Sequence, residues 1–251
     1  MASRDQLLTL CNDMLQPAKF KDYCPNGLQV EGRAEVQKIV SGVTASRAFI
    51  EAAIDAGADT LLVHHGLFWR GHDGAVTGWL KQRLALLLAH DINLLAYHLP
   101  LDAHPALGNN AQLGLLMGWE TLSRFGEQDL ACLGTPSAGC ETLEALVHNL
   151  HTTLGRAPVA VLPDPKRPLK RIAWCTGGAQ SWFEAAITAG ADAFITGEIS
   201  EPQAHLAQET GVAFLACGHH ATERYGAPAL AAHVASQLSL EHAFIDIGNP
   251  A

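Results

Sequence analysis

An internal repeat constrains the fold of this chain more than any other feature of its sequence. Residues 51–59 read EAAIDAGAD and residues 184–192 read EAAITAGAD, so the two segments differ only at their fifth position. Each is rich in alanine, has a glycine that can stop a helix, and lies between two apolar runs typical of strands. Convergence of similar helix–glycine–strand units is the alternative, but the match extends to the surrounding order of elements, which favours a duplication.

Apolar runs typical of strands alternate with helical segments along the whole chain. The expected strands are residues 38–43, 60–63, 92–97, 171–175, 193–196, 212–217 and 243–247. The expected helices are residues 3–15, 46–56, 78–90, a short one after Gly108, 141–154, 181–189, 201–210 and 221–238. This alternation predicts an α/β fold in which largely parallel or mixed sheets are flanked by helices.

The repeat also predicts how the chain divides. We expect a first α/β lobe over residues 1–124 and a second over residues 169–251 that completes the site. Residues 125–168 contain five prolines around one plausible helix at 141–154, so we expect a short connector or inserted segment there.

Composition excludes several classes of protein. With 48% hydrophobic and 16% charged residues, the chain is typical of an ordered globular protein. A net charge of −9 disfavours a nucleic-acid-binding surface, and the densest basic stretch, residues 166–171, is interrupted by Pro168. We find neither an apolar run of about 18 residues nor a signal-peptide pattern, so we expect a cytoplasmic protein with no membrane partner. Six scattered cysteines without a C-x-x-C pair predict reduced, mostly buried thiols.

Two adjacent histidines, His64 and His65, follow the apolar residues 61–63. Ligands of open α/β sheets bind beyond the carboxyl ends of the strands, so this pair stands where chemistry is expected. Neighbouring side chains that leave a strand point in different directions. The pair would therefore serve two neighbouring metal ions more easily than one. A solvated loop pair is the alternative when these two residues are considered alone.

Two further His–carboxylate pairs with the same spacing follow predicted strands. His98 and Asp102 come after the strand at 92–97, although Asp102 could equally be a helix cap or a turn residue. In the second half His219 and Glu223 stand four residues apart at the expected start of a helix. Side chains at this spacing approach a common point, so both could ligate one ion.

Aligning the two halves on their strand ends places residues 98–102 opposite 219–223, and residues 64–65 opposite 197–198. A pseudo-twofold axis would bring these strand ends together. The sequence therefore predicts a two-metal site with five ligands: His64, His65, Asp102, His219 and Glu223. Mixed His and carboxylate ligands favour two divalent ions among Zn, Mn, Fe, Co and Ni over Mg. Such a pair would activate water and hold a phosphoryl or carbonyl oxygen.

Three more residues are candidates for catalysis or for orienting the ligands. His98 and His220 stand beside predicted ligands and could position them. Glu198 lies at a strand end and could act as a general base, orient a ligand or be structural. No Walker A loop, G-x-S-x-G elbow or strand-borne G-x-G-x-x-G is present.

Six motifs together resemble one protein family. They are residues 22–32 (DYCPNGLQVEG), 63–66 (VHHG), 98–102 (HLPLD), 196–198 (TGE), 218–223 (GHHATE) and 246–250 (DIGNP). These motifs closely resemble those of the Nif-three-like family, also called the type 2 GTP cyclohydrolase I homologues, and above all its short bacterial YbgI-type branch. The resemblance covers essentially the whole chain and no ligand position departs from it.

This resemblance implies two similar, interlocked α/β lobes with a dinuclear metal centre between them. It assigns His64, Asp102 and Glu223 to one ion, and His65, His219 and Glu223 to the other, with Glu223 bridging. It also implies a toroidal homohexamer whose sites face an inner cavity. The family name alone does not fix a substrate.

Two classes of function remain open. The first is a metal-dependent hydrolase, cyclohydrolase-like or phosphohydrolase-like, that acts on a nucleotide-like small molecule. The second is a non-catalytic metal or ligand carrier, or a regulatory assembly, because no residue outside the ligand set stands out as a required acid or nucleophile. DNA binding is disfavoured by the acidic charge.

Overall fold

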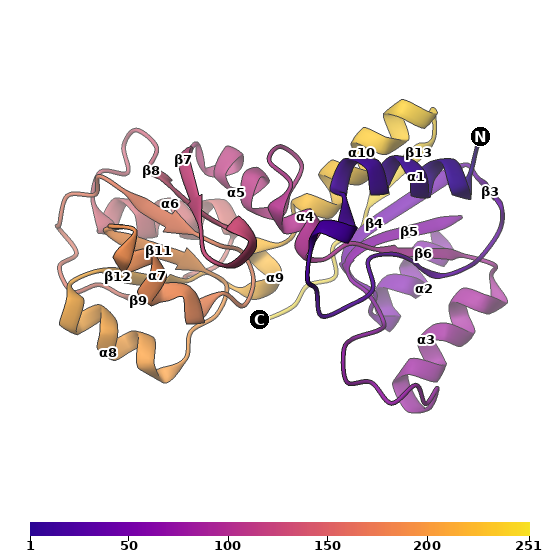
Figure 1. Ribbon diagram of the computed structural model, residues 1–251, viewed down its shortest axis with the longest axis horizontal. Helices are drawn as coiled ribbons and strands as arrows, with labels where there is room; N and C mark the ends of the chain where they lie inside the picture. Colours follow the sequence, from indigo (N-terminus) through magenta and orange to yellow (C-terminus); the bar gives the residue numbers. More distant parts are fainter. The chain divides into compact units, whose positions relative to one another are not determined.

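The computed structural model describes residues 1–251 and divides into two compact units, both of the predicted α/β class. The first unit comprises Met1–Gly108 and Arg224–Gly248, and the second comprises Asn109–Glu223 and Asn249–Ala251. Figure 1 labels the elements of both units.

The first unit is built on a five-stranded sheet in the order β13-β4-β5-β6-β2. β4, β5 and β6 run parallel, β13 adds to β4 in parallel, and β2 pairs antiparallel with β6. The strands are β2 Gly27–Val30, β4 Lys38–Thr44, β5 Thr60–His65, β6 Asn93–Ala96 and β13 Glu241–Phe244. A separate two-stranded sheet pairs β1 Ala2–Ser3 with β3 Glu35–Val36.

Two helices of the first unit, α1 and α2, begin at serines that cap them. The Ser3 hydroxyl accepts from the Gln6 N–H, with the Gln6 side chain accepting in return, and the Ser46 hydroxyl accepts from the Phe49 N–H. The helices are α1 Arg4–Leu15, η1 Pro17–Lys19, α2 Arg47–Asp55, α3 Gly78–Ala89, α4 Leu99–Ala103 and α10 Gly226–Leu238.

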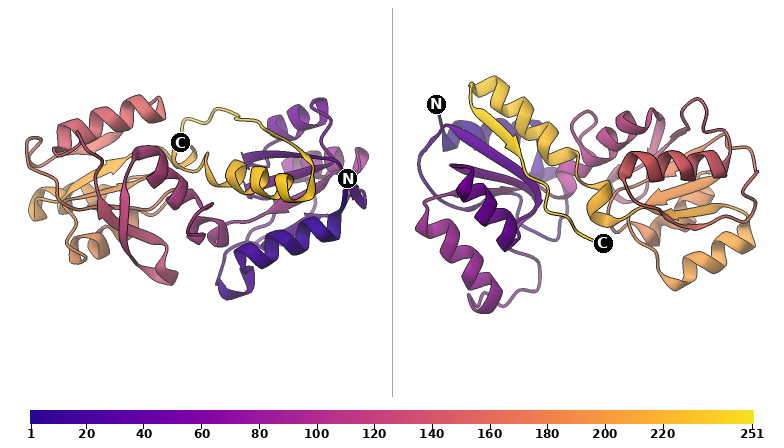
Figure 2. Two further views of the ribbon diagram at one scale, coloured as in Figure 1. Left: turned by 90° about the horizontal axis from the view of Figure 1, so that it is seen from above. Right: turned by 180° about the vertical axis from the view of Figure 1, so that it is seen from behind.

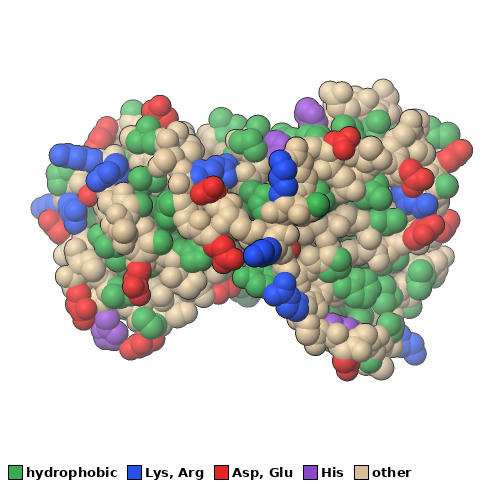
Figure 3. All heavy atoms as spheres, in the orientation of Figure 1, with side chains coloured by type: hydrophobic (Ala, Val, Ile, Leu, Met, Phe, Trp, Pro, Cys, Tyr) green, Lys and Arg blue, Asp and Glu red, His purple; other side chains and the backbone are tan.

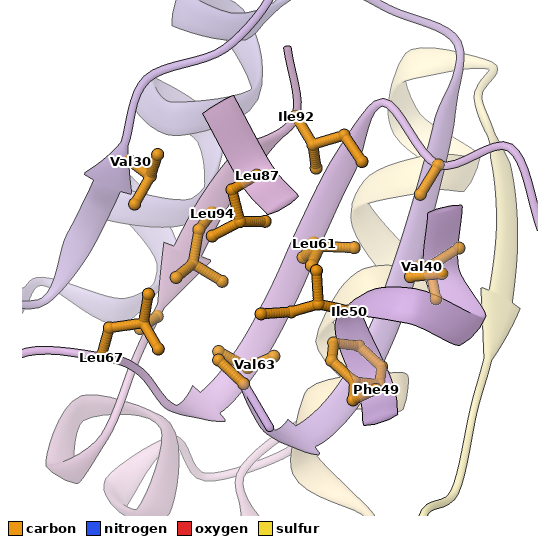
Figure 4. Close-up of a cluster of buried hydrophobic side chains, with 14 of the residues drawn as sticks. Val30, Val40, Phe49, Ile50, Leu61, Val63, Leu67, Leu87, Ile92 and Leu94 are labelled. Carbon is orange, nitrogen blue, oxygen red and sulfur yellow. The ribbon is translucent and has the colours of Figure 1, made fainter. Parts of the chain in front are cut away.

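The sheet of the first unit buries both faces, as a parallel sheet flanked by helices must. One face carries Val40, Leu61 and Leu94 against α2 and α3, and Figure 4 shows these side chains converging with Phe49 and Leu87. The opposite face packs against α1 and α10 through a second buried cluster that includes Ile39, Leu62, Leu95, Leu7 and Leu230. Figure 2 shows α10 running alongside this sheet. Burial on both faces explains why residues 61–63 of β5 are all apolar.

The second unit has a six-stranded sheet in the order β7-β8-β10-β11-β12-β9. β10, β11 and β12 are parallel, whereas β8 pairs antiparallel with β10 and β9 antiparallel with β12. The strands are β7 Glu120–Phe125, β8 Ala131–Thr135, β9 Val159–Val161, β10 Ile172–Trp174, β11 Ala193–Thr196 and β12 Ala213–Ala216. The three parallel strands and the antiparallel strand beyond them repeat the arrangement of β4, β5, β6 and β2.

Helices flank this sheet as well. They are α5 Asn109–Met117, η2 Glu127–Asp129, α6 Leu143–Leu154, η3 Gln180–Trp182, α7 Phe183–Thr188, α8 Glu201–Thr210 and α9 His219–Thr222. On one face Phe183 of α7 packs against Phe194 and Phe214 of the sheet, with ring centroids 6.2 and 4.9 Å apart. From another part of the sheet, the Trp174 indole N–H donates to the Asn110 carbonyl of α5.

The two copies of the internal repeat make the same local structure. Each ends on an aspartate that directly precedes a parallel strand: Asp59 precedes β5, and Asp192 precedes β11. Asp59 accepts from the Arg33 guanidinium at 2.7 Å and from two consecutive backbone N–H groups at the start of β4. Asp192 accepts from the Arg167 guanidinium at 2.9 Å and from two consecutive N–H groups just before β10. The matching residues therefore fasten corresponding strands in both units.

The observed division differs from the predicted lobes at 1–124, 125–168 and 169–251. Residues 125–168 are not a connector, because β8 and β9 lie within this stretch and pair with β10 and β12 of the second sheet. Residues 224–248 return to the first unit, where β13 pairs with β4. Antiparallel partners of this kind are set by long-range pairing and leave little periodic signal in the sequence.

The expected helix at 221–238 is interrupted near its start. α9 ends at Thr222 and α10 begins at Gly226, so Glu223 lies between two helices. None of the helices combines the length and apolar character needed to cross a membrane. All six cysteines are free and buried, as predicted. On the face drawn in Figure 3, Lys and Arg side chains lie in small separate groups among Asp and Glu.

Candidate functional site

The end of β5 carries the histidine pair of the first unit. His64 is fully buried, and its Nδ1 lies 2.9 Å from the Tyr97 carbonyl oxygen. His65 is half-buried, and its Nδ1 lies 3.2 Å from the Thr44 hydroxyl of β4. The two rings lie side by side, with centroids 4.6 Å apart and planes tilted by 43°. Strand alternation alone does not predict this proximity, because it sends neighbouring side chains to opposite faces.

Asp102 reaches the same place from α4, the short helix after β6. The N–H groups of Leu101 and Asp102 donate to the His98 carbonyl, which forms the turn that α4 needs. Asp102 is 7% exposed, and its Oδ1 lies 3.5 Å from Nε2 of His64. The structure therefore brings both His65 and Asp102 next to His64 in the first unit.

His98 joins this group from the end of β6. One ring nitrogen from each of His64, His65 and His98 lies within 4.8 Å of the others. Nδ1 of His98 lies 2.7 Å from Oδ1 of Asp22, and its backbone N–H donates to Oδ1 of Asn26 at 2.7 Å. Asp22 and Asn26 have no place among the residues predicted for the site. The only sequence feature that could have identified them is the motif at residues 22–32, and that motif by itself does not indicate a chemical role.

In the second unit His219 and Glu223 meet around α9. Nε2 of His219 lies 3.2 Å from Oε2 of Glu223, which is 3% exposed. Nδ1 of His219 lies 2.6 Å from Oε1 of Glu198, which follows β11. Glu198 thus lies beside a predicted ligand, and it also accepts from the Gln180 side-chain amide at 3.1 Å.

A glycine makes room for the Glu223 carboxylate. Gly177 follows β10 with φ of +71°, and a Cβ built on it would overlap Oε1 of Glu223 and lie 3.2 Å from Nε2 of His219. Its N–H donates to the Thr222 hydroxyl at 3.0 Å, and its carbonyl accepts from the Thr196 hydroxyl at 3.0 Å. Both the backbone conformation and the space at this position require glycine.

The pKa of His219 reflects its two carboxylate partners. Burial disfavours its protonated form, but hydrogen bonds and charge attraction from Glu223 and Glu198 outweigh burial and raise the pKa to about 9. In the first unit, burial opposes ionisation of Asp22, yet the hydrogen bonds from His98 and Asn26 lower its pKa to about 2. Both sets of residues are organised around paired imidazoles and carboxylates.

The third catalytic candidate, His220, lies differently. It is buried, and its backbone N–H donates to the carbonyl of Ala251 at 3.2 Å. The histidines predicted to be unremarkable include His205, which pairs with Glu201 of its own helix at 2.9 Å on an exposed surface.

The donor chemistry of these residues fits a divalent metal ion. Buried carboxylates such as Asp102 and Glu223 carry a desolvation cost that a bound cation offsets. Where a histidine Nδ1 bonds to an oxygen, its tautomer and ring orientation are fixed and Nε2 remains to ligate an ion. His64, His65 and His219 each have this arrangement. These histidines and the buried carboxylates beside them are therefore candidate ligands of a metal ion.

Aromatic and cationic side chains lie next to the histidines of the first unit. The Trp69 ring meets that of His98 edge to face at 5.2 Å and lies 5.8 Å from that of His65. Tyr23, 55% exposed, lies 6.4 Å from His98 on a neighbouring loop. The guanidinium of Arg70 lies over the Tyr23 ring at 5.7 Å and donates to the Asp22 carbonyl. These residues tie the loop before β2 to the loop after β5.

Comparison with curated proteins finds close relatives over the full length. The chain is 56% identical over 251 residues to a Neisseria meningitidis serogroup A protein called "GTP cyclohydrolase 1 type 2 homolog", with 100% of both chains covered. It is 48% identical over 252 residues to an Escherichia coli K12 protein of the same name, with 98% of both covered.

Solved structures share the fold. The chain matches one described as "Structural genomics, protein ybgI, unknown function" with a TM-score of 0.95, 46% identity and full coverage of both chains. TTHA1606 from Thermus thermophilus matches with a TM-score of 0.89 and 31% identity, again over both whole chains. The family model described as Duf34/NIF3 (NGG1p interacting factor 3) matches residues 2–250. The chain therefore belongs to the Duf34/NIF3 family, as its sequence motifs indicate.

Proposed function

We propose that this protein is a dinuclear metal-dependent hydrolase that acts on a nucleotide-like small molecule. One observation carries the proposal. In each unit a histidine has Nδ1 bonded to an oxygen while Nε2 faces a buried carboxylate: His64 faces Asp102 at 3.5 Å, and His219 faces Glu223 at 3.2 Å. Each unit thus carries half of a metal-ligand set of the same design.

In this proposal both of the similar lobes supply metal ligands. His64, Asp102 and Glu223 hold one ion, and His65, His219 and Glu223 hold the other. The matching bonds of Asp59 and Asp192 support a duplicated origin of the two lobes, since they fasten corresponding strands. Mixed imidazole and carboxylate donors favour Zn, Mn, Fe, Co or Ni.

Two such ions would polarise a phosphoryl or carbonyl oxygen of the substrate. They would also lower the pKa of a water molecule bound to them to about 7, so that it could lose a proton at neutral pH. The chain's own residues supply rigidity. Tyr97, Thr44 and Glu198 hold the ligand histidines in fixed orientations. Gly177 keeps the space next to Glu223 clear of a side chain.

The side chains beside the histidines support the proposed substrate class. Trp69 and Tyr23 are partly exposed aromatic rings, and the Arg70 guanidinium is a cation suited to phosphate or carboxylate. A planar heterocycle bearing an anionic group matches this combination. The name of the relatives, GTP cyclohydrolase 1 type 2 homolog, points to the same class. We also propose a homohexamer, as the family resemblance implies, which light scattering would test.

Turnover by the metal-loaded protein tests the proposal. Purified protein loaded in turn with Zn²⁺, Mn²⁺, Fe²⁺, Co²⁺ and Ni²⁺ is assayed against GTP, other nucleotides and simple phosphate esters. Two matched variants are compared: His65→Ala removes a proposed ligand, and His90→Ala removes an exposed histidine of the same unit as a control. We expect metal-dependent turnover that only His65→Ala abolishes. Absence of turnover on every substrate class with every metal rejects the hydrolase.

A second function, a non-catalytic metal or ligand carrier, is favoured by one observation. Asp22 and Glu198, carboxylates beside the histidines, are already bonded to His98 and His219. Neither is therefore placed as an independent general acid. A carrier would retain a small ligand through purification without changing it. Mass spectrometry of the denatured protein would detect such a ligand, and its absence together with freely exchanging metals would reject this alternative.

A further inference from the structure

β7 is the outermost strand of the second sheet, and a strand of this chain pairs with only one of its edges. It lies at one end of the strand order, next to β8. Residues 120–123 are exposed, and Leu122 is 57% exposed. The open edge of such a strand can pair with another chain, and proteins commonly guard it with lysine or proline. β7 contains neither residue, so its sequence does not prevent pairing in this way.

The sequence of β7 is its own complement in an antiparallel pairing. Residues 120–124 read ETLSR. When two such strands run antiparallel about Leu122, Glu120 lies opposite Arg124. Thr121 then lies opposite Ser123, and Leu122 lies opposite its own copy. Opposite charges, paired hydroxyls and paired apolar side chains are cross-strand neighbours that stabilise antiparallel sheets. Two identical strands paired in this way are related by a twofold axis, the commonest symmetry of homo-oligomers.

β7 also carries a β-bulge at its centre. Thr121 pairs with Gly134 of β8 and Ser123 pairs with Leu133, so Leu122 has no partner on β8. A bulge can guard an edge strand against pairing, and this is the alternative interpretation. A guarded edge usually presents charged side chains, however, whereas the residue at this bulge is an exposed leucine. An apolar side chain at this position favours a contact with another chain.

The helix that leads into β7 exposes two more leucines. Leu115 is 73% exposed and Leu116 is 46% exposed, and both lie near the end of α5. α5 packs against β7, as Figure 1 shows, and only two residues separate the two elements. Exposed apolar side chains that gather in one stretch, unlike single ones, indicate a contact surface. The end of α5 and the edge of β7 therefore form one candidate surface.

We propose that β7 is a contact between two copies of this chain. The two strands pair antiparallel about a twofold axis at Leu122, so that Glu120 of each copy lies opposite the partner's Arg124. The two six-stranded sheets then continue into one another. This contact goes beyond the proposed function, since it involves neither the metal ligands nor the substrate. The proposed homohexamer does not say which surfaces of the chains meet, and β7 supplies one of them.

The first test removes the apolar centre of the contact. Leu122→Asp places two carboxylates opposite each other at the twofold axis, and Leu88→Asp changes a leucine of similar exposure, 63%, in the first unit. Sedimentation velocity over a range of concentrations measures the association of the full chain. We expect Leu122→Asp to raise the dissociation constant of the contact by about 10-fold or more, as at the centre of an interface. Leu88→Asp should leave it unchanged.

The second test reverses the charges. In Glu120→Arg positions 120 and 124 are both positive, and in Arg124→Glu both are negative, so each variant alone places like charges opposite each other. A mixture of the two variants places opposite charges at every such position. We expect each variant alone to dissociate and the mixture to associate again. Glu127→Arg makes the same change of charge at an exposed residue beyond the strand and should associate like the unaltered chain.

Three results would overturn the proposal. The first is equal association of Leu122→Asp and the unaltered chain. The second is a mixture of the two charge variants that stays dissociated although both fold, as judged by circular dichroism. If Arg124→Glu does not fold, Leu122→Asp and Glu120→Arg decide, and unchanged association in both rejects the contact. The third is an unaltered chain that is a monomer at every concentration, which would reject the homohexamer as well. An oligomer that ignores all of these substitutions rejects the β7 contact alone.

Discussion

Glu198 holds His219 through a bond of 2.6 Å between Oε1 and Nδ1 while Nε2 of the same ring faces Glu223 at 3.2 Å. The imidazole therefore lies between two carboxylates with different tasks. Glu223 is buried, whereas the side chain of Glu198 is 43% exposed. A residue that the sequence offered as a general base is thus bonded to a predicted ligand.

Replacing Glu198 with glutamine tests this role. The amide oxygen can still accept from Nδ1, but its negative charge is lost, so Nε2 becomes a weaker donor. We expect Glu198→Gln to lower metal affinity by about 10–100-fold, measured by calorimetric titration with Zn²⁺. Glu201→Gln, an exposed glutamate of the same unit, is the control. Equal affinity in both variants would show that Glu198 does not act on the ligand.

The raised pKa of His219 predicts how the metal-free protein responds to pH. Since the pKa is about 9 in the folded chain and 6.5 ordinarily, the folded state binds the proton more tightly. The stabilisation is therefore complete below pH 6.5 and is lost as pH rises through 9. Urea unfolding in a chelator should show this decline in the unfolding free energy, and Glu198→Gln should reduce it. A profile that is flat over this range in the unaltered chain would contradict the assignment.

Metal binding should have the opposite pH dependence. An ion displaces the proton from His219, so affinity should rise between pH 6.5 and 9 and protons should be released. Calorimetry at pH 7.5 in two buffers of different ionisation enthalpy measures the number released. Binding without proton release would mean that His219 does not ligate the ion.

Gly177 supplies a steric test of the Glu223 position. In Gly177→Ala the new methyl group overlaps Oε1 of Glu223, and the backbone is held at a φ of +71°. We expect loss of about 1 kcal/mol or more in stability and a lower metal content. Gly139→Ala is the matched control, because Gly139 has a φ of +85° but nothing within 4 Å of the added Cβ. It should lose stability alone, and equal metal loss in both variants would refute the steric account.

The repeat makes a separate prediction about stability. Asp192→Asn removes the charge that pairs with Arg167 and weakens the bonds to the N–H groups before β10. We expect a loss of about 1–3 kcal/mol in the unfolding free energy, and a similar loss for Asp59→Asn. Asp13→Asn, at an exposed position, should have little effect. A large difference between Asp59→Asn and Asp192→Asn would show that the two copies are not equivalent.

The strands and helices with strong periodicity were predictable from the sequence. The apolar run before His64 is β5, and the repeat marks corresponding helices α2 and α7. The strands β7, β8 and β9 were not predicted. β8 and β9 pair antiparallel with the distant strands β10 and β12, whereas β7 is an edge strand that pairs only with β8. The burial of the three strands is partial or follows no simple alternation. Tertiary pairing decides such strands.

The candidate ligands were predictable because His and carboxylate residues recur at matching strand ends. The residues that orient them were not. The partners of His65 and His64 are a threonine hydroxyl and the backbone carbonyl of Tyr97, and groups of these kinds occur throughout any sequence. Asp22 lies 76 residues from His98, so nothing in the sequence connects the two. The sequence around Gly177 does not indicate that this residue makes room for the carboxylate of Glu223. These relationships arise only when the sheets form.

The most direct test of the central claim is the number of ions bound per chain. Elemental analysis of protein saturated with Zn²⁺ and freed of excess metal should give two ions per chain, with anomalous scattering locating both beside the five ligands. Glu223→Gln should bind fewer than two, because the proposed function makes Glu223 a ligand of both ions. A chain that binds no ion, or a Glu223→Gln variant that still binds two, would contradict the account.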